Sequence, residues 1–208
     1  MLKAIVVDDH PFIRSSVKML LKQEHFEVVA EADNGADAVQ LAREHAPDLI
    51  ILDIAMPKLD GLEVISRISA LGLPSKILVL TSQSALFYSM RCMKAGAAGY
   101  ISKTNDLDEL IKAIKAVMDG YTFFPNLATS SVRRSDVDAT DLELIQSLSD
   151  RELTILQQLS NGLSNKEIGD AMLLSNKTVS TYKTRLIEKL KVKSVVYLAD
   201  FAKRNNLV

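Results

Sequence analysis

Over the first 120 residues, short apolar runs alternate with helical patterns, and this alternation restricts the possible folds more than any other feature of the chain. Several runs are continuous stretches of β-branched residues and leucine, as expected of parallel strands buried on both faces. The candidate strands are residues 3–7, 27–31, 48–52, 76–80 and 98–102. The candidate helices are residues 11–23, 35–45, 62–71, 85–95 and 107–118. Five such units predict a doubly wound, five-stranded parallel α/β sheet with right-handed crossovers.

Polar side chains stand directly after four of these strands. Asp8 and Asp9 follow the first strand, Asp53 the third, Thr81 the fourth and Lys103 the fifth. If the strand order is 2-1-3-4-5, the first and third strands flank the switch point, and ligands bind outside their carboxyl ends. We therefore expect all five residues at one edge of the sheet.

The residue types at this edge suit phosphoryl chemistry. Converging carboxylates raise one another's pKa unless a cation neutralises them, and Mg²⁺ needs only one or two carboxylates plus water and phosphate. Lys103 adds a point charge and Thr81 a hydroxyl for a phosphoryl group, while Asp53 is the best candidate nucleophile. Any one of these acids alone could be a cap or turn residue, but that reading does not explain the whole set.

The segments "VVDDH", "ILDIAMPKLDG", "LTS" and "GYISK" resemble the signatures of response-regulator receiver domains, over residues 1 to about 120. The resemblance implies a flavodoxin/CheY-like fold whose Asp53 accepts phosphate from a histidine kinase. It also implies a role for each neighbouring residue. The implied Mg²⁺ ligands are Asp8, Asp9, Asp53 and the carbonyl of Ala55; the implied phosphoryl-binding and switch residues are Thr81, Lys103 and Tyr100.

Two positions depart from many receivers. Thr104 stands where proline often follows the lysine, so a cis peptide there would be a non-proline one, costing about 3 kcal/mol. Ala55, two residues after Asp53, cannot orient a hydrolytic water, which predicts a long-lived phosphoryl state. His10 directly follows the acid pair, and we interpret it as a local partner or helix-start residue. The single cysteine, Cys92, is interpreted as a buried structural thiol.

Beyond the alternating region, the chain changes character. Residues 122–145 are rich in Ser, Thr and Asp and read as a linker between a domain at 1–121 and one at 146–208. Charge is uneven: residues 1–120 hold 13 Lys and Arg against 16 Asp and Glu, whereas residues 146–208 hold 10 against 6. A basic C-terminal module predicts an anionic partner, although a solvated helix face is the alternative.

The C-terminal segments all read as short helices, at residues 150–161, 165–173, 176–190 and 194–205. "SNKEIGDAMLLSNKTVSTYKTRLIEKL" predicts a helix, a short turn and a longer helix, with small polar and basic residues opposite an apolar stripe. Residues 148–205 resemble the LuxR-type helix-turn-helix, which together with a receiver is the arrangement of the NarL/FixJ family, most like its BvgA/EvgA branch. The implied DNA-contacting residues are Lys166, Asn176, Lys177, Ser180, Thr181, Thr184, Arg185 and Lys189. The implied dimerisation residues are Val196, Tyr197 and Ala199.

These observations predict a transcription regulator, phosphorylated at Asp53 and binding promoter DNA as a homodimer. Its expected partners are a sensor histidine kinase, double-stranded DNA and a second copy, with RNA polymerase as a further candidate. No apolar run is long enough for a membrane span and the first residues lack a signal-peptide pattern, so a cytoplasmic location is expected. Two rivals remain. One is an aspartyl-phosphate hydrolase of the haloacid dehalogenase type, which needs an acid where Ala55 stands. The other is a protein-interaction module that keeps the fold but has neither phosphorylation nor DNA binding.

Overall fold

The computed structural model describes residues 1–56, 61–125 and 139–208. The chain separates into two compact units, Met1–Leu127 and Ala128–Val208. Residues 126–138, in the middle of the expected linker, and residues 57–60, in the quoted "MPKLDG" segment, lie outside the described residues. The finer domain boundaries at residues 121 and 145 stay a prediction.

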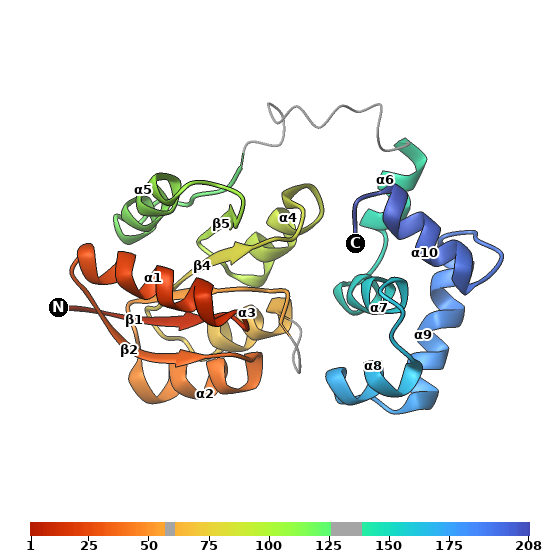
Figure 1. The fold of residues 1–208 in the computed structure, drawn as a ribbon, viewed down its shortest axis with the longest axis horizontal. Helices are drawn as coiled ribbons and strands as arrows, with labels where there is room; N and C mark the ends of the chain where they lie inside the picture. The colour runs from red at the N-terminus through yellow and green to blue at the C-terminus, as the bar shows by residue number, and fades with distance from the viewer. Residues whose placement is uncertain (57–60, 126–138) are drawn as a thin grey trace. The chain divides into compact units, whose positions relative to one another are not determined.

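The first unit is a five-stranded parallel sheet with the order β2-β1-β3-β4-β5 (Figure 1). This is the predicted fold and strand order. The strands are β1 Leu2–Val7, β2 Phe26–Ala32, β3 Leu49–Leu52, β4 Lys76–Thr81 and β5 Gly99–Ser102. The helices are α1 Pro11–Gln23, α2 Gly35–His45, α3 Gly61–Ala70, α4 Ala85–Ala95 and α5 Leu107–Met118.

Alternate residues of the buried strands form one continuous core with α1 and α5. Successive strand side chains point to opposite faces of a sheet, so this core takes every second residue, such as Ala4 and Val6 of β1 and Leu49 and Ile51 of β3. Leu21 of α1 and Ile114 of α5 are fully buried against them. Because both faces are covered, the strands read as unbroken apolar runs.

Local capping chemistry begins the helices next to the site edge. Pro11 is at the first turn of α1, where its missing N–H costs no helical hydrogen bond. The Asn34 side chain accepts a hydrogen bond from the N–H of Asp37, and the Asp106 side chain accepts one from the N–H of Glu109. These caps place each helix start close to a strand's carboxyl end.

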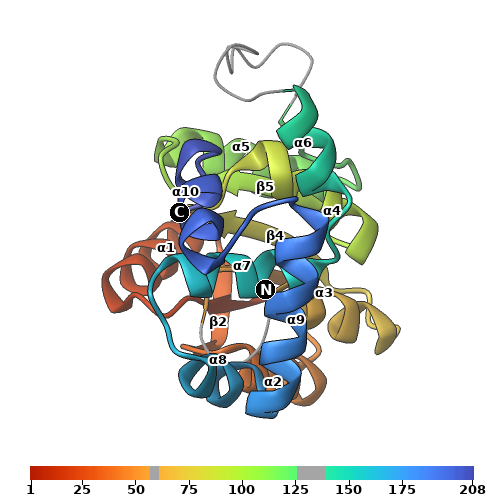
Figure 2. The same cartoon turned by 90° about the vertical axis from the view of Figure 1, so that its right-hand side faces the viewer.

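The second unit contains only helices in its described part (Figure 2). They are α6 Ala139–Gln146, α7 Asp150–Ser160, α8 Asn165–Met172, α9 Asn176–Lys189 and α10 Val195–Arg204. Helix α6 begins inside the segment 122–145 that reads as a linker. Its helical pattern is only two turns long, so the sequence does not separate it clearly from the linker. The sheet followed by this small helical unit is the fold class that the sequence predicts. None of the described helices is long and apolar enough to cross a membrane.

The α8–α9 pair has the connection of a helix-turn-helix. Helix α8 lies beside the N-terminal end of α9 in both views, and α7 packs against α8, α9 and α10 (Figures 1 and 2). Ser164 and Ser175 are the N-caps of α8 and α9, and each accepts a hydrogen bond from a backbone N–H three residues on.

Candidate functional site

The sheet brings two carboxylates from neighbouring strands together at one edge. Asp8 follows β1 and Asp53 follows β3, and the N–H of Asp53 continues the ladder by donating to the carbonyl of Val7 at 2.9 Å. Both residues are almost completely buried, with exposed fractions of 2% and 1%. Ligand atoms of Asp8, Asp9, His10 and Asp53 all lie within 4.8 Å of one another. The predicted convergence of acids at the switch point is therefore present.

Lys103 bridges the two buried carboxylates. Its Nζ lies 2.7 Å from Oδ2 of Asp8 and 2.6 Å from Oδ2 of Asp53. Burial favours the neutral amine, but the hydrogen bonds and charges of Asp53 and Asp8 outweigh it and raise the pKa of Lys103. The lysine therefore stays a cation at the point where an anionic group would join Asp53.

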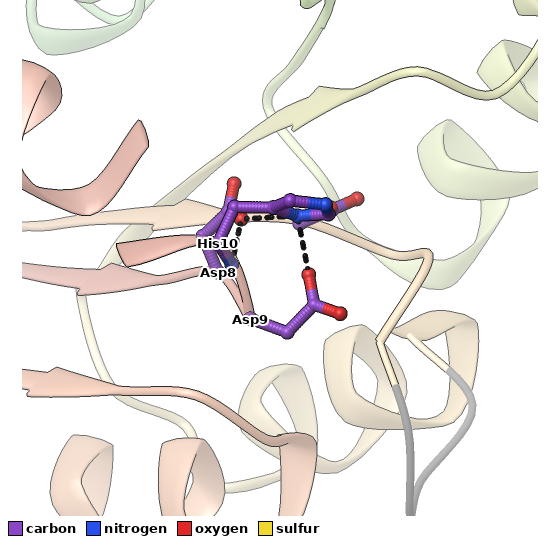
Figure 3. Close-up of side chains that lie close together, drawn as sticks. Asp8, Asp9 and His10 are labelled. Atoms are coloured by element: carbon purple, nitrogen blue, oxygen red, sulfur yellow. Dashed lines mark hydrogen bonds and ion pairs between the residues drawn. The ribbon is translucent and has the colours of Figure 1, made fainter. Parts of the chain in front are cut away.

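Asp9 and His10 are the more exposed members of the cluster. Figure 3 shows the His10 ring facing Asp8 and Asp9. Nδ1 of His10 lies 2.7 Å from Oδ1 of Asp9 and 3.3 Å from Oδ1 of Asp8, while the His10 side chain is 66% exposed. The Oδ1 atom of Asp9 is buried and, despite its short contact with His10, has no hydrogen-bond partner. A cation is a suitable partner for a buried carboxylate oxygen that accepts no hydrogen bond.

Thr81 and Tyr100 are both buried at the adjoining strand ends. The hydroxyl of Thr81 accepts a long hydrogen bond, 3.4 Å, from the N–H of Gln83. The hydroxyl of Tyr100 donates to the carbonyl of the same Gln83 at 2.7 Å, and the ring is 1% exposed. Burial raises the pKa of Tyr100, with smaller effects from Cys92 and Asp53. Gln83 thus contacts both predicted switch residues through its backbone.

The two positions that depart from many receivers have ordinary backbones. The N–H of Ala55 donates to Oδ1 of Asp53 at 2.9 Å, so this loop residue helps to hold the Asp53 carboxylate in place. The peptide between Lys103 and Thr104 is trans, as are all peptides of the described residues. Cys92, the chain's single cysteine, is buried and in no disulfide, consistent with a structural thiol.

One residue at this edge escaped the sequence analysis. Arg14 donates from Nη1 to the backbone carbonyl of Asp8 at 2.7 Å, and its Nε lies 3.5 Å from Glu31 of β2. It therefore anchors the loop that carries the acid pair. A single arginine one turn into a helix has no distinctive spacing from the acids, so no sequence signal marks it.

In the second unit, the predicted DNA-contacting side chains lie on the surface of α8 and α9. All eight of them are exposed, whereas Val179 and Leu186 of α9 are buried in the core. The hydroxyls of Thr181 and Thr184 donate to backbone carbonyls one turn earlier. The guanidinium of Arg185 lies over the ring of Tyr182, 5.9 Å from its centroid. This face presents small polar groups flanked by cations.

Lys189 differs from the others because its charge has a partner within the unit. Its Nζ lies 2.7 Å from Oε2 of Glu152, which is buried at the start of α7. Burial opposes the charge on Glu152, but hydrogen bonds from Lys189 and Ser149 outweigh it and lower the pKa of this carboxyl. Of the DNA-contacting predictions, Lys189 is thus the one that also holds α9 onto α7.

Helix α10 has residues that pack into the core of the unit and others that do not, and the predicted dimerisation residues are among the latter. Leu198, Phe201 and Ala202 are buried in the unit, whereas Val196 and Tyr197 are 70% and 52% exposed. Ala199 is half-buried between the two groups. These two exposed apolar side chains can contact another molecule. The sequence alone could not tell them from the residues of α10 that pack into the core.

Two protein families match the chain, in the same order as the two units. Residues 4–115 match the response regulator receiver domain. Residues 146–202 match the LuxR family of bacterial regulatory proteins. The chain is a response regulator of the NarL/FixJ family. Such a regulator is a transcription factor of a two-component system rather than an enzyme, and this excludes the hydrolase and the module without DNA binding.

Relatives of this response regulator align along its whole length. The virulence-factor transcription regulator BvgA of Bordetella pertussis is 54% identical over 99% of this chain and 98% of its own. The DNA-binding transcriptional activator EvgA of Escherichia coli strain K12 is 35% identical over 99% and 100%. These two relatives agree with the predicted branch of the family.

Solved structures of the RcsB response regulator are also similar. One from Salmonella typhimurium has a TM-score of 0.75 at 25% identity and covers 97% of this chain and 96% of that one. Another, of two RcsB dimers on two parallel DNAs, has a TM-score of 0.57 at 26% identity, with 98% of each chain covered.

Proposed function

We propose that this response regulator receives a phosphoryl group on Asp53 from the phosphohistidine of a sensor kinase and then binds promoter DNA as a dimer. A cytoplasmic location and contact with RNA polymerase accompany this proposal. The observation that carries it is the bridge from Lys103 to Asp8 and Asp53, beside an Asp9 oxygen that has no hydrogen-bond partner.

Receiver domains in general bind Mg²⁺ through such an acidic cluster, and the residues here fit that ion. Asp8, Asp9 and Asp53 supply hard oxygen donors, and the carbonyl of Ala55 is the fourth proposed ligand. When bound, the ion neutralises charge on the acids and on the incoming phosphoryl oxygens.

The chain's own residues divide the remaining work. An Asp53 oxygen attacks phosphorus, forming the P–O bond as the P–N bond to the kinase histidine breaks. The ammonium of Lys103 then exchanges one carboxylate contact for a phosphoryl oxygen, and the hydroxyl of Thr81 turns to donate to another. Because Thr81 and Tyr100 share Gln83 as a neighbour, moving Thr81 changes the surroundings of the Tyr100 hydroxyl.

The DNA-binding part of the proposal places α9 in a major groove. Small polar side chains near its N-terminal half would contact bases, and flanking lysines and arginines would contact phosphates. Lys189, whose ammonium already pairs with Glu152, would contribute less to phosphate binding than Lys166 or Arg185. The exposed Val196 and Tyr197 would join two copies on half-sites about one helical turn apart.

Acetyl phosphate with Mg²⁺ tests the proposal without a known kinase. We expect wild type to gain one acyl phosphate per chain and to bind promoter fragments more tightly afterwards. Asp53→Asn should show neither change. Asp48→Asn, at the opposite end of β3, is the matched control and should behave as wild type does. Equal DNA affinity before and after phosphorylation would refute the switch, and labelling of Asp53→Asn would refute the acceptor.

A further inference from the structure

The first residues after α5 extend the sheet by one short segment. Phe123 pairs in parallel with Gly99 of β5, outside the five named strands. Its N–H donates to the carbonyl of Ala98 at 3.0 Å, and its carbonyl accepts from the N–H of Tyr100 at 2.7 Å. The edge of a sheet presents backbone groups that need partners. Phe123 therefore pairs with the outer edge of β5, although it lies within residues 122–145, which read as a linker.

Three features bring Phe123 to this edge. Gly120 follows the C-cap of α5 with a left-handed φ of 89°, which ends the helix and turns the chain. A Cβ atom on Gly99 would lie 2.9 Å from the carbonyl oxygen of Phe123, so the two backbones can approach this closely only at a glycine. The Phe123 ring packs against the core that the strands form with α1 and α5. Turn, glycine and ring all favour the same pairing.

Tyr100 connects this pairing to the phosphoryl site. Its hydroxyl donates to the carbonyl of Gln83 at 2.7 Å, and the N–H of Gln83 donates to the hydroxyl of Thr81. Its own N–H donates to the carbonyl of Phe123. The side chain of Tyr100 therefore contacts the loop after β4, while its backbone holds the first residues after α5.

We propose that residues 121–125 form a strap on the edge of β5, and that a phosphoryl group on Asp53 opens this strap. The inference rests on the proposed function and adds how the phosphoryl group acts on the connection to the second unit. When Thr81 turns to a phosphoryl oxygen, the Gln83 backbone loses a contact and the Tyr100 hydroxyl loses the fixed position of its acceptor. The Tyr100 ring is buried in a close-packed interior, so it cannot change place without moving the β5 backbone.

The strap is easily disturbed by such a movement. Two hydrogen bonds, both made by Phe123, join its backbone to β5. A shift of Tyr100 weakens the shorter of them directly. An open strap adds residues 121–125 to the segment that connects the two units, and so changes the reach of the DNA-binding unit.

The coupling is reciprocal, because a ligand that opens the strap binds more tightly to a chain whose strap is already open. Gly99→Ala opens it, since the added methyl group displaces the Phe123 carbonyl; the other close atom, a terminal methyl of Leu78, can rotate away. Phe123→Ala opens it differently, by removing the ring from the core while keeping both backbone groups. Thr122→Ala is the matched control, because this exposed side chain lies beside Phe123 and leaves both hydrogen bonds in place.

The first test is hydrogen exchange of single amides by NMR, on the full-length chain with Mg²⁺ and the phosphoryl mimic BeF₃⁻. The amides of Phe123 and Tyr100 bond across the strap, whereas the amide of Ala98 bonds to Ile77 of β4 at 2.8 Å and is an internal control. With BeF₃⁻ we expect the first two to exchange at least about fivefold faster, the lower end of typical couplings between sites. The Ala98 amide should not change, and no amide should respond in Asp53→Asn.

The second test is the affinity for BeF₃⁻ in the presence of Mg²⁺. We expect Gly99→Ala and Phe123→Ala to bind it at least about fivefold more tightly than wild type, and Thr122→Ala to bind it equally. Unchanged or weaker binding in both strap variants overturns the inference.

The outcomes also separate the strap from the proposed function. BeF₃⁻ that binds wild type without faster exchange of the Phe123 amide overturns the strap alone and leaves Asp53 as the acceptor. Slower exchange of that amide overturns the proposed opening, because the phosphoryl group would then close the strap. Absence of binding to wild type, or undiminished binding to Asp53→Asn, overturns the acceptor site and the strap together.

Discussion

Ala55 determines what can stand beside a phosphoryl group on Asp53. Its exposed methyl group offers no hydrogen bond, while its N–H is already engaged with the Asp53 carboxylate. A water molecule that attacks the phosphoryl group from this side therefore has no side chain to orient it. Orientation of an attacking group supplies much of the catalysis in such reactions.

We predict that Ala55→Asn shortens the life of the phosphoryl group, by several-fold or more, because an amide there can hold the water. The check is the decay of protein phosphorylated with acetyl phosphate, after the reagent is removed. Thr104→Ala, beyond Lys103, is a control outside the attack path. Equal or slower decay in Ala55→Asn would contradict the role given to this position.

Glu152 is a second residue whose environment has a measurable consequence. It completes a capping box with Ser149 and holds Lys189. Because its pKa is lowered from 4.5 in the folded chain, its contribution to stability is complete above that value and is lost as the pH falls through the folded-state pKa.

We therefore predict that Glu152→Gln destabilises the second unit by about 1–3 kcal/mol at pH 7, and by much less at pH 3. Urea unfolding with hydrogen exchange of α7 and α9 amides measures both. Glu188→Gln, exposed on α9, should have little effect at either pH. A loss that is the same at both pH values would mean that the carboxylate charge is not the cause.

Among the elements, the turn between α8 and α9 depends on one glycine. A Cβ atom on Gly169 would lie 2.7 Å from the carbonyl oxygen of Leu174, which is backbone and cannot rotate away. The residue after α8, Leu173, already has a left-handed φ of 56°. The turn therefore has no spare room.

Gly169→Ala should cost about 1–3 kcal/mol of stability and weaken promoter binding, because α9 shifts relative to α8. Circular dichroism during urea unfolding and a DNA-binding titration measure the two effects. Asp170→Ala, on the exposed side of the same helix, should remain within about 0.5 kcal/mol of wild type. Full stability in Gly169→Ala would show that the turn can adapt.

The elements also show which structural information the sequence carries. Strand and helix positions followed from apolar periodicity and caps, because burial on both faces of β1 and β3 leaves an unmistakable run. The strand order followed from the resemblance to receiver domains and not from periodicity. The five site residues followed because each one ends a strand. Arg14, the Gln83 carbonyl and the Glu152–Lys189 pair did not follow, because each contact depends on where a long side chain or a loop carbonyl points in space. The same holds for α10, where only packing separates Val196 from Leu198.

At the scale of the whole molecule, charge and exposed apolar groups are distributed unequally between the units. The acidic first unit carries the proposed phosphoacceptor, and the basic second unit carries the proposed DNA-contacting face together with the exposed Val196 and Tyr197. Strong binding to paired half-sites requires both a DNA face and a contact between copies.

We predict that Tyr197→Asp abolishes the advantage of paired over single half-sites, while single-site affinity and stability change little because this side chain is outside the core. Gel-shift titrations on both DNAs and thermal unfolding test this. Lys203→Asp, an exposed substitution later in α10, controls for the added charge near DNA. Retained preference for paired sites would place the contact between copies elsewhere.

Tyr100 gives the chain a built-in optical label. The protein has no tryptophan and five tyrosines, so its near-ultraviolet spectrum is a tyrosine spectrum. Because burial raises the pKa of Tyr100, this ring stays protonated at a pH where a tyrosine in water becomes tyrosinate. The absorbance of tyrosinate at moderately alkaline pH therefore omits Tyr100 for as long as its hydroxyl stays on the Gln83 carbonyl. Because Tyr88 is buried as well, it is a further tyrosinate absent from Tyr100→Phe that counts the molecules in which that ring has left the interior.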